Sequence, residues 1–179
     1  MKKILELGEH YVSDFIKSDD IERKKYSLDL IMDEKIGAAR LTSMAPSNIM
    51  WGKYWYRSGI NVTMKKELGY IVEEIIGRVK LTPGDVWLDI ACNDGTLLSQ
   101  LPTNLIKIGI DPCEDSFLEE SSKYGTIVQD YFSYDAYSRV ENKKAKVITT
   151  IAMFYDLIEP KPFIEDILKV LDDDGVWVL

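Results

Sequence analysis

The stretch that decides the fold is residues 85–101, which read DVWLDIACNDGTLLSQL. Its first part, VWLDIA, is an apolar run of the length of a buried strand, and its last part, GTLLSQL, has the spacing of a helix that is beginning. Between them stands ACNDG, a short turn of small and polar residues. A buried strand, a tight turn and a helix in this order predict the first half of a βαβ unit, and therefore an α/β domain.

The same alternation continues to the end of the sequence. Four further strands are expected, at 106–111, 125–130, 146–154 and 175–179. Two further helices are expected at 114–124 and 160–171, and 133–144 is either helical or irregular. Upstream, apolar residues recur at three- and four-residue steps from Met64 to Val79, which predicts an amphipathic helix. Apolar strands between helices indicate a doubly wound, mostly parallel Rossmann-like sheet with both faces covered.

The N-terminal residues predict a small β-containing appendage. YSLDLIMDE (26–34) alternates apolar and polar residues and predicts a strand, with GAARLTSMA (37–45) as its hairpin partner. We therefore expect two domains, a module at 1–50 and a Rossmann-like domain at 51–179. The sequence stops inside the last expected strand, so we expect either a truncated form of a longer protein or another chain, including a second copy, along that edge.

Composition narrows the function classes. The formal net charge is −8 and no basic stripe is visible, which argues against nucleic acid as a partner. No apolar run has the roughly 18 residues that a membrane span needs, and no signal peptide is visible. The two cysteines, Cys92 and Cys113, are expected to be reduced thiols of a cytoplasmic protein. His10 is the only histidine, so a catalytic triad or a multi-histidine zinc site at the later motifs would need it to fold back onto them.

Polar residues follow successive strands of the predicted sheet. Asp89 ends the first strand, and Asp111, 22 positions later, ends the second. An acid about 20 residues after the first turn is placed to accept ribose hydroxyls. Asp130 ends the third strand and could accept from the exocyclic amine of adenine, with Tyr131 or Phe132 beside the base. In such sheets ligands bind at the carboxyl ends of the strands.

Each of these residues also has a simpler interpretation. Asp89 could brace its turn, Asp111 could be a turn aspartate before proline, and Asp130 could be an exposed loop acid. Cys92 is interpreted as a small packing residue, since no base lies near it in the sequence. Only the joint pattern, with polar residues at several successive strand ends, favours a binding site.

The composition of the ACNDG turn favours one ligand class over another. It lacks the G-x-G-x-x-G set that a dinucleotide pyrophosphate requires. Small residues at Ala91 and Gly95 allow close approach, and the helix start that follows offers free N–H groups. A polar turn suits a ligand with an amino-acid end, so S-adenosylmethionine is favoured over NAD. An NAD- or nucleotide-binding Rossmann protein stays as an alternative.

Together, LDIACNDGTLL, IGIDP, DYFS, ITTIAMF and DGVWVL resemble the class I S-adenosylmethionine-dependent methyltransferases. Within them the sequence is most similar to the nucleotide-sugar C-methyltransferase-like branch, whose turn reads SNDG. The upstream segments ILELGEHYVSDFI, YSLDLIMDEKIGAARL and WGKYWYRSGINVTMKKEL resemble that branch's N-terminal module and its Tyr-x-Tyr-x-Ser segment. The resemblance implies S-adenosylmethionine as cofactor, S-adenosylhomocysteine as product, and a small-molecule acceptor such as a nucleotide sugar.

The resemblance also implies which residues bind the cofactor. Those expected around its methionine end are Asp89, Ala91, Asn93 and Gly95. Those expected at the ribose and the adenine are Asp111, Asp130 and Tyr131. Those expected to approach from the N-terminal segment and the fourth strand are Tyr56, Ser58, Thr150 and Ala152.

Two departures from the branch bear on function. Its structural zinc is held by two cysteine pairs, but the first would precede Met1 and the second falls where Asp33 and Ile36 stand, so no zinc is expected. Its Tyr-x-x-His-type catalytic segment and C-terminal domain have no counterpart in this sequence. C-methylation needs a base, which is therefore not assigned. The candidates near the fourth strand are Tyr155, Asp156 and Glu159. We expect a methyltransferase, or a module that binds S-adenosylmethionine and needs a partner for activity.

Overall fold

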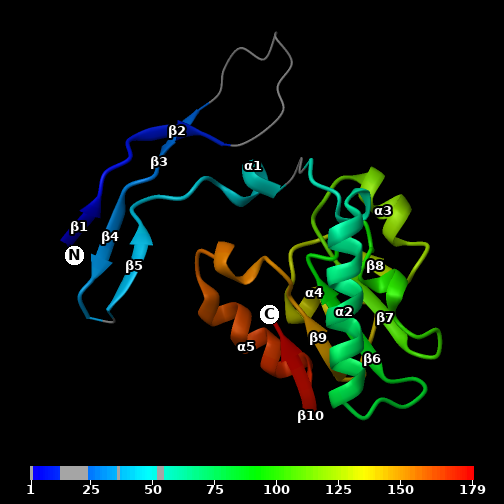
Figure 1. Ribbon diagram of the computed structural model, residues 1–179. Coiled ribbons are helices and arrows are strands. Elements are labelled where there is room, and N and C mark those ends of the chain that lie inside the picture. The colour runs from blue at the N-terminus through cyan, green and yellow to red at the C-terminus, as the bar shows by residue number, and fades with distance from the viewer. Residues whose placement is uncertain (1, 13–23, 36, 52–54) are drawn as a thin grey trace. The chain divides into compact units, whose positions relative to one another are not determined.

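The computed structural model describes residues 2–12, 24–35, 37–51 and 55–179, which fall into two compact units, Met1–Trp55 and Tyr56–Leu179 (Figure 1). Parts of the segments that carry the N-terminal resemblance, among them Ile36 and Tyr54, lie outside the described residues. The expected division into domains at residues 50 and 51 stays a prediction.

The N-terminal unit is made of short antiparallel strands. One sheet has the order β1-β4-β5, formed by Lys2–Leu5, Leu30–Asp33 and Ala38–Leu41. A separate pair joins β2 (Glu9–Tyr11) to β3 (Lys25–Ser27), and a short helix, α1, covers Ser47–Trp51. The expected hairpin is present, since β4 and β5 pair antiparallel from Leu30↔Leu41 to Asp33↔Ala38.

The single strand expected at 26–34 is wrong, because the chain changes sheets at Leu28 and Asp29. The Leu28 N–H donates to the Gly8 carbonyl at 3.0 Å. The Asp29 carboxylate accepts from the Gly8 N–H at 3.2 Å and from the Lys3 ammonium at 3.1 Å. Alternation of apolar residues does not reveal such a break, because both short strands keep the same period.

The C-terminal unit is built on a five-stranded parallel sheet with the order β10-β9-β6-β7-β8. Its strands are β6 Val86–Ile90, β7 Ile106–Ile110, β8 Thr126–Val128, β9 Ala145–Thr149 and β10 Leu171–Val178. The chain moves outward from β6 through β7 to β8, then crosses back to β9 on the other side of β6. The strand order therefore reverses between β6 and β9, and the predicted doubly wound α/β sheet is confirmed.

Helices cover both faces of this sheet. Helix α2 (Val62–Arg78) lies over one face (Figure 1), where its Leu68, Val72 and Ile75 belong to the same buried cluster as Trp87. Helices α4 (Tyr134–Ser138) and α5 (Pro160–Val170) contribute to a second cluster, which includes Val86, Leu88 and Ile90. Successive residues of β6 thus point to opposite faces, and all five are buried, as expected for a central strand.

The helix expected directly after the ACNDG turn is wrong. The chain there forms turns and one short 3-10 helix, η2, at Leu98–Gln100. The Ser99 N–H reaches the Gly95 carbonyl at 2.9 Å, but the Gln100 N–H already bonds three residues back, to Leu97. Leu101 precedes Pro102 and is extended, as residues before proline tend to be, which ends the helical geometry. The hydrogen bonds thus tighten to three-residue steps, and the chain becomes extended before a regular helix forms.

The other expected elements are present with shifted ends. Helix α3 covers Asp115–Ser121. Strand β9 ends at Thr149, so turns at 151–153 and the start of a 3-10 helix, η3, at Phe154–Asp156 replace the last part of the strand expected at 146–154. Strand β10 begins earlier than expected, and its register on β9 shifts between Leu171 and Val176. Within the residues that the structure describes, no helix has the length and apolarity to cross a membrane.

Gly95 is fixed by its neighbours in helix α3. Its φ is +76°, and a Cβ there would lie 2.7 Å from the Cα of Ser121. We predict that Gly95→Ala lowers the free energy of unfolding by at least about 2 kcal/mol, because left-handed backbone and steric overlap both oppose the methyl group. Urea unfolding followed by circular dichroism measures this. Gly77→Ala is the control, since a Cβ at that helical position meets nothing within 4 Å, and a similar loss there would contradict the argument.

Candidate functional site

The candidate site lies at the carboxyl ends of β6, β7 and β9, where the strand order reverses. Asp89 is paired in register with Gly109 of β7 on one side and with Thr149 of β9 on the other. Asp111 follows the last residue of β7 directly. The fold therefore brings two predicted acids, Asp89 and Asp111, to the same edge of the sheet as the ACNDG turn.

The turn itself has an unusual backbone. Ala91, Asn93 and Gly95 have φ values of +61°, +53° and +76°, so alternate residues occupy the left-handed region. This region is costly for an alanine. Each of the three N–H groups is bonded: to the Ile110 carbonyl at 2.8 Å, to Asp111 Oδ2 at 2.8 Å and to the Cys92 carbonyl at 2.9 Å. Such held strain is typical of ligand sites.

Asp111 is the acid that fixes the turn against β7. It is 5% exposed, and its two oxygens accept from different backbone N–H groups: Oδ2 from Asn93 and Oδ1 from Cys113, both at 2.8 Å. A carboxylate oxygen has two lone pairs. Asp111 is therefore oriented by the backbone and still has acceptor capacity on each oxygen.

Asp89 is buried beneath the turn. Its Oδ1 accepts from the Thr149 hydroxyl at 2.6 Å, and the Trp87 indole N–H in turn donates to that hydroxyl at 3.3 Å. Burial raises the pKa of the Asp89 carboxyl to about 7. The Thr149 hydrogen bond opposes this shift and the nearby charge of Asp111 adds to it. Asp89 therefore titrates near neutral pH, where a neighbouring cation would favour its charged form.

We predict that Asp89 makes stability fall as pH rises from about 4 to 7. The folded state keeps a proton in this range that the unfolded state releases, so ionisation opposes folding. The free energy of unfolding of the wild type should fall by on the order of 1.4 kcal/mol for each pH unit of the window, relative to that of Asp89→Asn, which does not titrate at this position. Urea unfolding at several pH values measures this, with Asp173→Asn at an exposed position as control. Parallel profiles for the wild type and Asp89→Asn would contradict the assignment.

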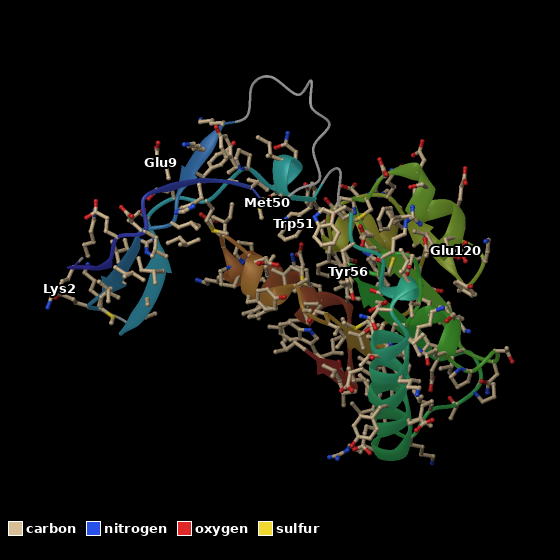
Figure 2. The ribbon with its side chains drawn as sticks, turned by 45° about the horizontal axis from the view of Figure 1, so that its top comes forward. Lys2, Glu9, Met50, Trp51, Tyr56 and Glu120 are labelled. Carbon is tan, nitrogen blue, oxygen red and sulfur yellow. The ribbon has the colours of Figure 1, made fainter. Side chains whose placement is uncertain are left out.

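Asn93 and Asp94 hold the 56–60 segment against the turn. Asn93 Oδ1 accepts from the Ser58 N–H at 3.1 Å, and its Nδ2 donates to the Tyr56 carbonyl at 2.9 Å. Asp94 Oδ2 accepts from the Gly59 N–H at 2.8 Å. Tyr56, where the segment begins, is labelled in Figure 2. We call these three hydrogen bonds the clamp. It brings Tyr56 and Ser58 beside Asn93, with which they were predicted to share a site.

We predict that Asn93→Ala releases one amide in particular. The Ser58 N–H should exchange with solvent deuterium at least roughly tenfold faster, because its acceptor is removed. The Thr63 N–H, which is bonded to the Asn61 side chain at 2.8 Å, should keep its rate. Amide-resolved hydrogen exchange checks both, with the exposed Asn142→Ala as a matched control. Unchanged protection at Ser58 would show that the clamp does not hold the segment in solution.

Asp130 and Tyr131, the residues predicted at the adenine, are more exposed than Asp89 and Asp111. The Asp130 carboxylate forms an ion pair with Arg139 and accepts from the Tyr131 N–H at 2.8 Å. It is partly exposed, as the simpler interpretation of a loop acid also expects. Tyr131 is 45% exposed. Burial, followed by the charges of Cys113 and Asp111, raises the pKa of the Tyr131 hydroxyl, so this side chain lies near the β7 end.

Of the two residues predicted to bind the cofactor after β9, Thr150 makes contacts with β10. The Thr150 hydroxyl accepts from the Trp177 indole N–H at 2.9 Å, and its backbone N–H donates to the Val178 carbonyl at 2.9 Å. Thr150 thereby fastens β10 to the sheet. Ala152 is exposed and has a φ of +57°, so the chain bends sharply two residues beyond Thr150.

Sequence reasoning missed two residues of the site. Thr149, which was not among the predicted residues, is the hydroxyl that contacts Asp89. Asp94 extends the clamp, and its place inside the quoted turn was the only sequence signal for it. Cys92 is a buried packing residue whose sulfur would lie 2.6 Å from a Cβ at Gly109, and burial raises the pKa of its thiol well above the usual range.

No protein-family model and no curated protein sequence matches this chain. Among solved structures, plantazolicin methyltransferase BpumL in complex with SAH and a triazolic desmethylPZN analog matches with a TM-score of 0.52 at 19% identity, over 68% of this chain and 48% of that chain. This chain has the Rossmann-like fold of a methyltransferase.

Two weaker matches are also methyltransferases. An S-adenosylmethionine-dependent methyltransferase from Clostridium acetobutylicum has a TM-score of 0.48 at 21% identity, over 63% of this chain and 48% of that chain. One from Geobacter sulfurreducens, in complex with S-adenosyl-L-homocysteine, has a TM-score of 0.47 at 19% identity, over 70% and 50%. This chain thus spans about half the length of the methyltransferases that it resembles.

Proposed function

We propose that this chain is an S-adenosylmethionine-dependent methyltransferase that binds its cofactor across the ends of β6, β7 and β9. The observation that carries the proposal is the pairing of the strained turn with Asp111. One hydrogen bond, from the Asn93 N–H to Asp111 Oδ2, joins the element expected at the methionine end to the acid expected at the ribose. The BpumL structure with SAH bound shares the fold.

Two carboxylates of the site could accept hydrogen bonds from the cofactor. Asp111 keeps acceptor capacity on both oxygens, which suits the two hydroxyls of a ribose. Asp89 has a pKa of about 7 and accepts one hydroxyl hydrogen bond, so the ammonium of an amino-acid end would favour its charged form. Asp130 fits less directly because Arg139 engages its carboxylate, whereas Tyr131 lies close enough to Asp111 for its pKa to respond to that charge.

When bound, S-adenosylmethionine supplies a methyl group that its sulfonium already activates. The chain's own task is then to orient an acceptor in line and to exclude water. If the acceptor is carbon, a base must also remove a proton. Asp156 in η3 is our candidate, since burial raises the pKa of its carboxyl. We propose a small-molecule acceptor, with a nucleotide sugar as the candidate that the sequence resemblance names.

Binding without transfer is the second candidate. The only histidine, His10, lies in the N-terminal unit, so the C-terminal unit has no imidazole base of its own. In this alternative the cytoplasmic chain binds S-adenosylmethionine, and a second copy or a partner chain beside the edge strand β10 completes the active site. Transfer of labelled methyl to nucleotide sugars by the purified chain alone would decide against it.

The first test is calorimetric titration with S-adenosylmethionine and S-adenosylhomocysteine. We predict micromolar binding that Asp111→Asn weakens at least roughly tenfold, because a charged hydrogen-bond acceptor is worth about 1.5–3 kcal/mol. Asp173→Asn, which removes an acid that is 92% exposed and paired with Lys144, is the matched control and should bind as the wild type does.

Fold and binding must be separated in this test, because Asp111 also accepts two backbone N–H groups. Circular dichroism and thermal unfolding of each variant identify a variant that has lost its fold. A folded wild type that binds neither ligand would contradict the proposal. Tight binding of NADH in place of S-adenosylmethionine would support the dinucleotide alternative instead.

A further inference from the structure

A cavity of about 430 Å³ lies beside the turn, and none of the residues predicted to bind the cofactor lines it. Its walls come from the 56–60 segment, the start of α2, and the chain from Asp94 to Gln100. Helix α3 and Tyr124, three residues after it, complete the lining. Glu120, labelled in Figure 2, marks the α3 wall. The cavity has one member of the clamp, the Gly59–Asp94 pair, in its lining.

Two cationic side chains, Arg57 and Lys65, line this cavity, and among the described residues neither lies within ion-pair distance of a carboxylate. The charge of Arg57 nevertheless reaches Glu120, whose carboxyl pKa it helps to lower. The Arg57 guanidinium lies 4.0 Å over the Phe117 ring, and donates to the Ser116 carbonyl at 3.3 Å and to its hydroxyl at 2.7 Å. These contacts orient the guanidinium without neutralising it. Within the described part of the chain, the Lys65 ammonium has neither a hydrogen bond nor an ion pair.

The two acids in the lining are already engaged. Asp94 accepts from the Gly59 N–H at 2.8 Å and from the Thr96 hydroxyl at 2.6 Å. Glu120 accepts from the Lys123 ammonium at 2.5 Å and from the Tyr124 hydroxyl at 3.3 Å. Asp94 keeps its charge, because both of its donors are neutral, but the oxygens of both acids have partners. Arg57 and Lys65 still offer N–H donors, which favours a ligand rich in acceptor oxygens.

We infer that this cavity binds the phosphate group of a small phosphate ester. A phosphate has three strong acceptor oxygens and close to two negative charges at neutral pH, and its oxygens match the N–H donors of Arg57 and Lys65. The planar guanidinium suits two phosphate oxygens at once, and the lysine acts as a mobile point charge. The cavity is larger than a phosphate group alone, and the Ser99 hydroxyl and Gln100 amide in its lining suit the polar remainder of the ester.

This site goes beyond the proposed function and does not depend on it. A phosphate would bind the side chain of Arg57, and the clamp holds the peptide groups on both sides of this residue, through the Tyr56 carbonyl and the Ser58 N–H. Occupancy should therefore slow hydrogen exchange at Ser58 and Gly59. The same amides report on the cavity whether or not S-adenosylmethionine binds.

The test is titration of the cofactor-free, isotope-labelled full chain with inorganic phosphate at constant ionic strength, followed by amide resonances. We expect saturable shifts at Gly59 and Lys65, with a midpoint in the low millimolar range. Lys65→Gln should weaken binding roughly tenfold. Lys66→Gln is the matched control, since Lys66 is the exposed neighbour and does not line the cavity.

Three outcomes would overturn the inference. The first is a shift that rises linearly without saturation, as non-specific screening gives. The second is equal binding by the wild type and Lys65→Gln. The third is binding of acetate as tightly as phosphate, which would show that the site does not distinguish a phosphate from a carboxylate ligand. A failure of S-adenosylmethionine to bind would leave this result intact, because the titration contains no cofactor.

Discussion

The architecture of the candidate site depends on one buried carboxylate, that of Asp111. It accepts the N–H of Asn93 in the turn after β6 and the N–H of Cys113 in the loop after β7, so a single side chain fixes two strand ends. The turn needs this support because alternate residues in it have positive φ. Asn93, once placed, grips the backbone at Tyr56 and Ser58. The position of the 56–60 segment therefore depends on the turn, and the position of the turn depends on Asp111 at the end of β7.

The sequence predicted those parts of the fold that depend on periodic burial. Strand β6, helix α2 and the parallel sheet follow from patterns in which most buried positions carry an apolar side chain, with Asp89 as the exception within β6. The region after Gly95 was misjudged because its apolar residues are buried as expected, but Pro102 stops the helix that they would form. The break at Asp29 escaped for a different reason: a side chain that captures two N–H groups leaves no periodic signal.

The site itself was predictable in its acids and less so in its neighbours. Asp89 and Asp111 could be placed at one edge because the ends of parallel strands meet there. Their partners could not, since whether Thr149 or Thr150 faces Asp89 depends on where β9 lies in register with β6. The role of Asn93 was also hidden, because its amide bonds a segment more than 30 residues earlier in the sequence. The ion pair of Asp130 with Arg139 likewise reflects folding that local sequence does not specify.

The clamp has a consequence for how this protein can vary. Asn93 and Asp94 reach only main-chain atoms of Tyr56, Ser58 and Gly59, so the hold on this segment is indifferent to the side chains at Tyr56 and Ser58. Gly59 is the exception, because a Cβ there would lie 2.8 Å from an Asp94 oxygen. The backbone of the segment is therefore held in place whichever side chains stand at positions 56 and 58. Selection, or an engineer, can exchange two side chains beside the site without altering the bonds that position them.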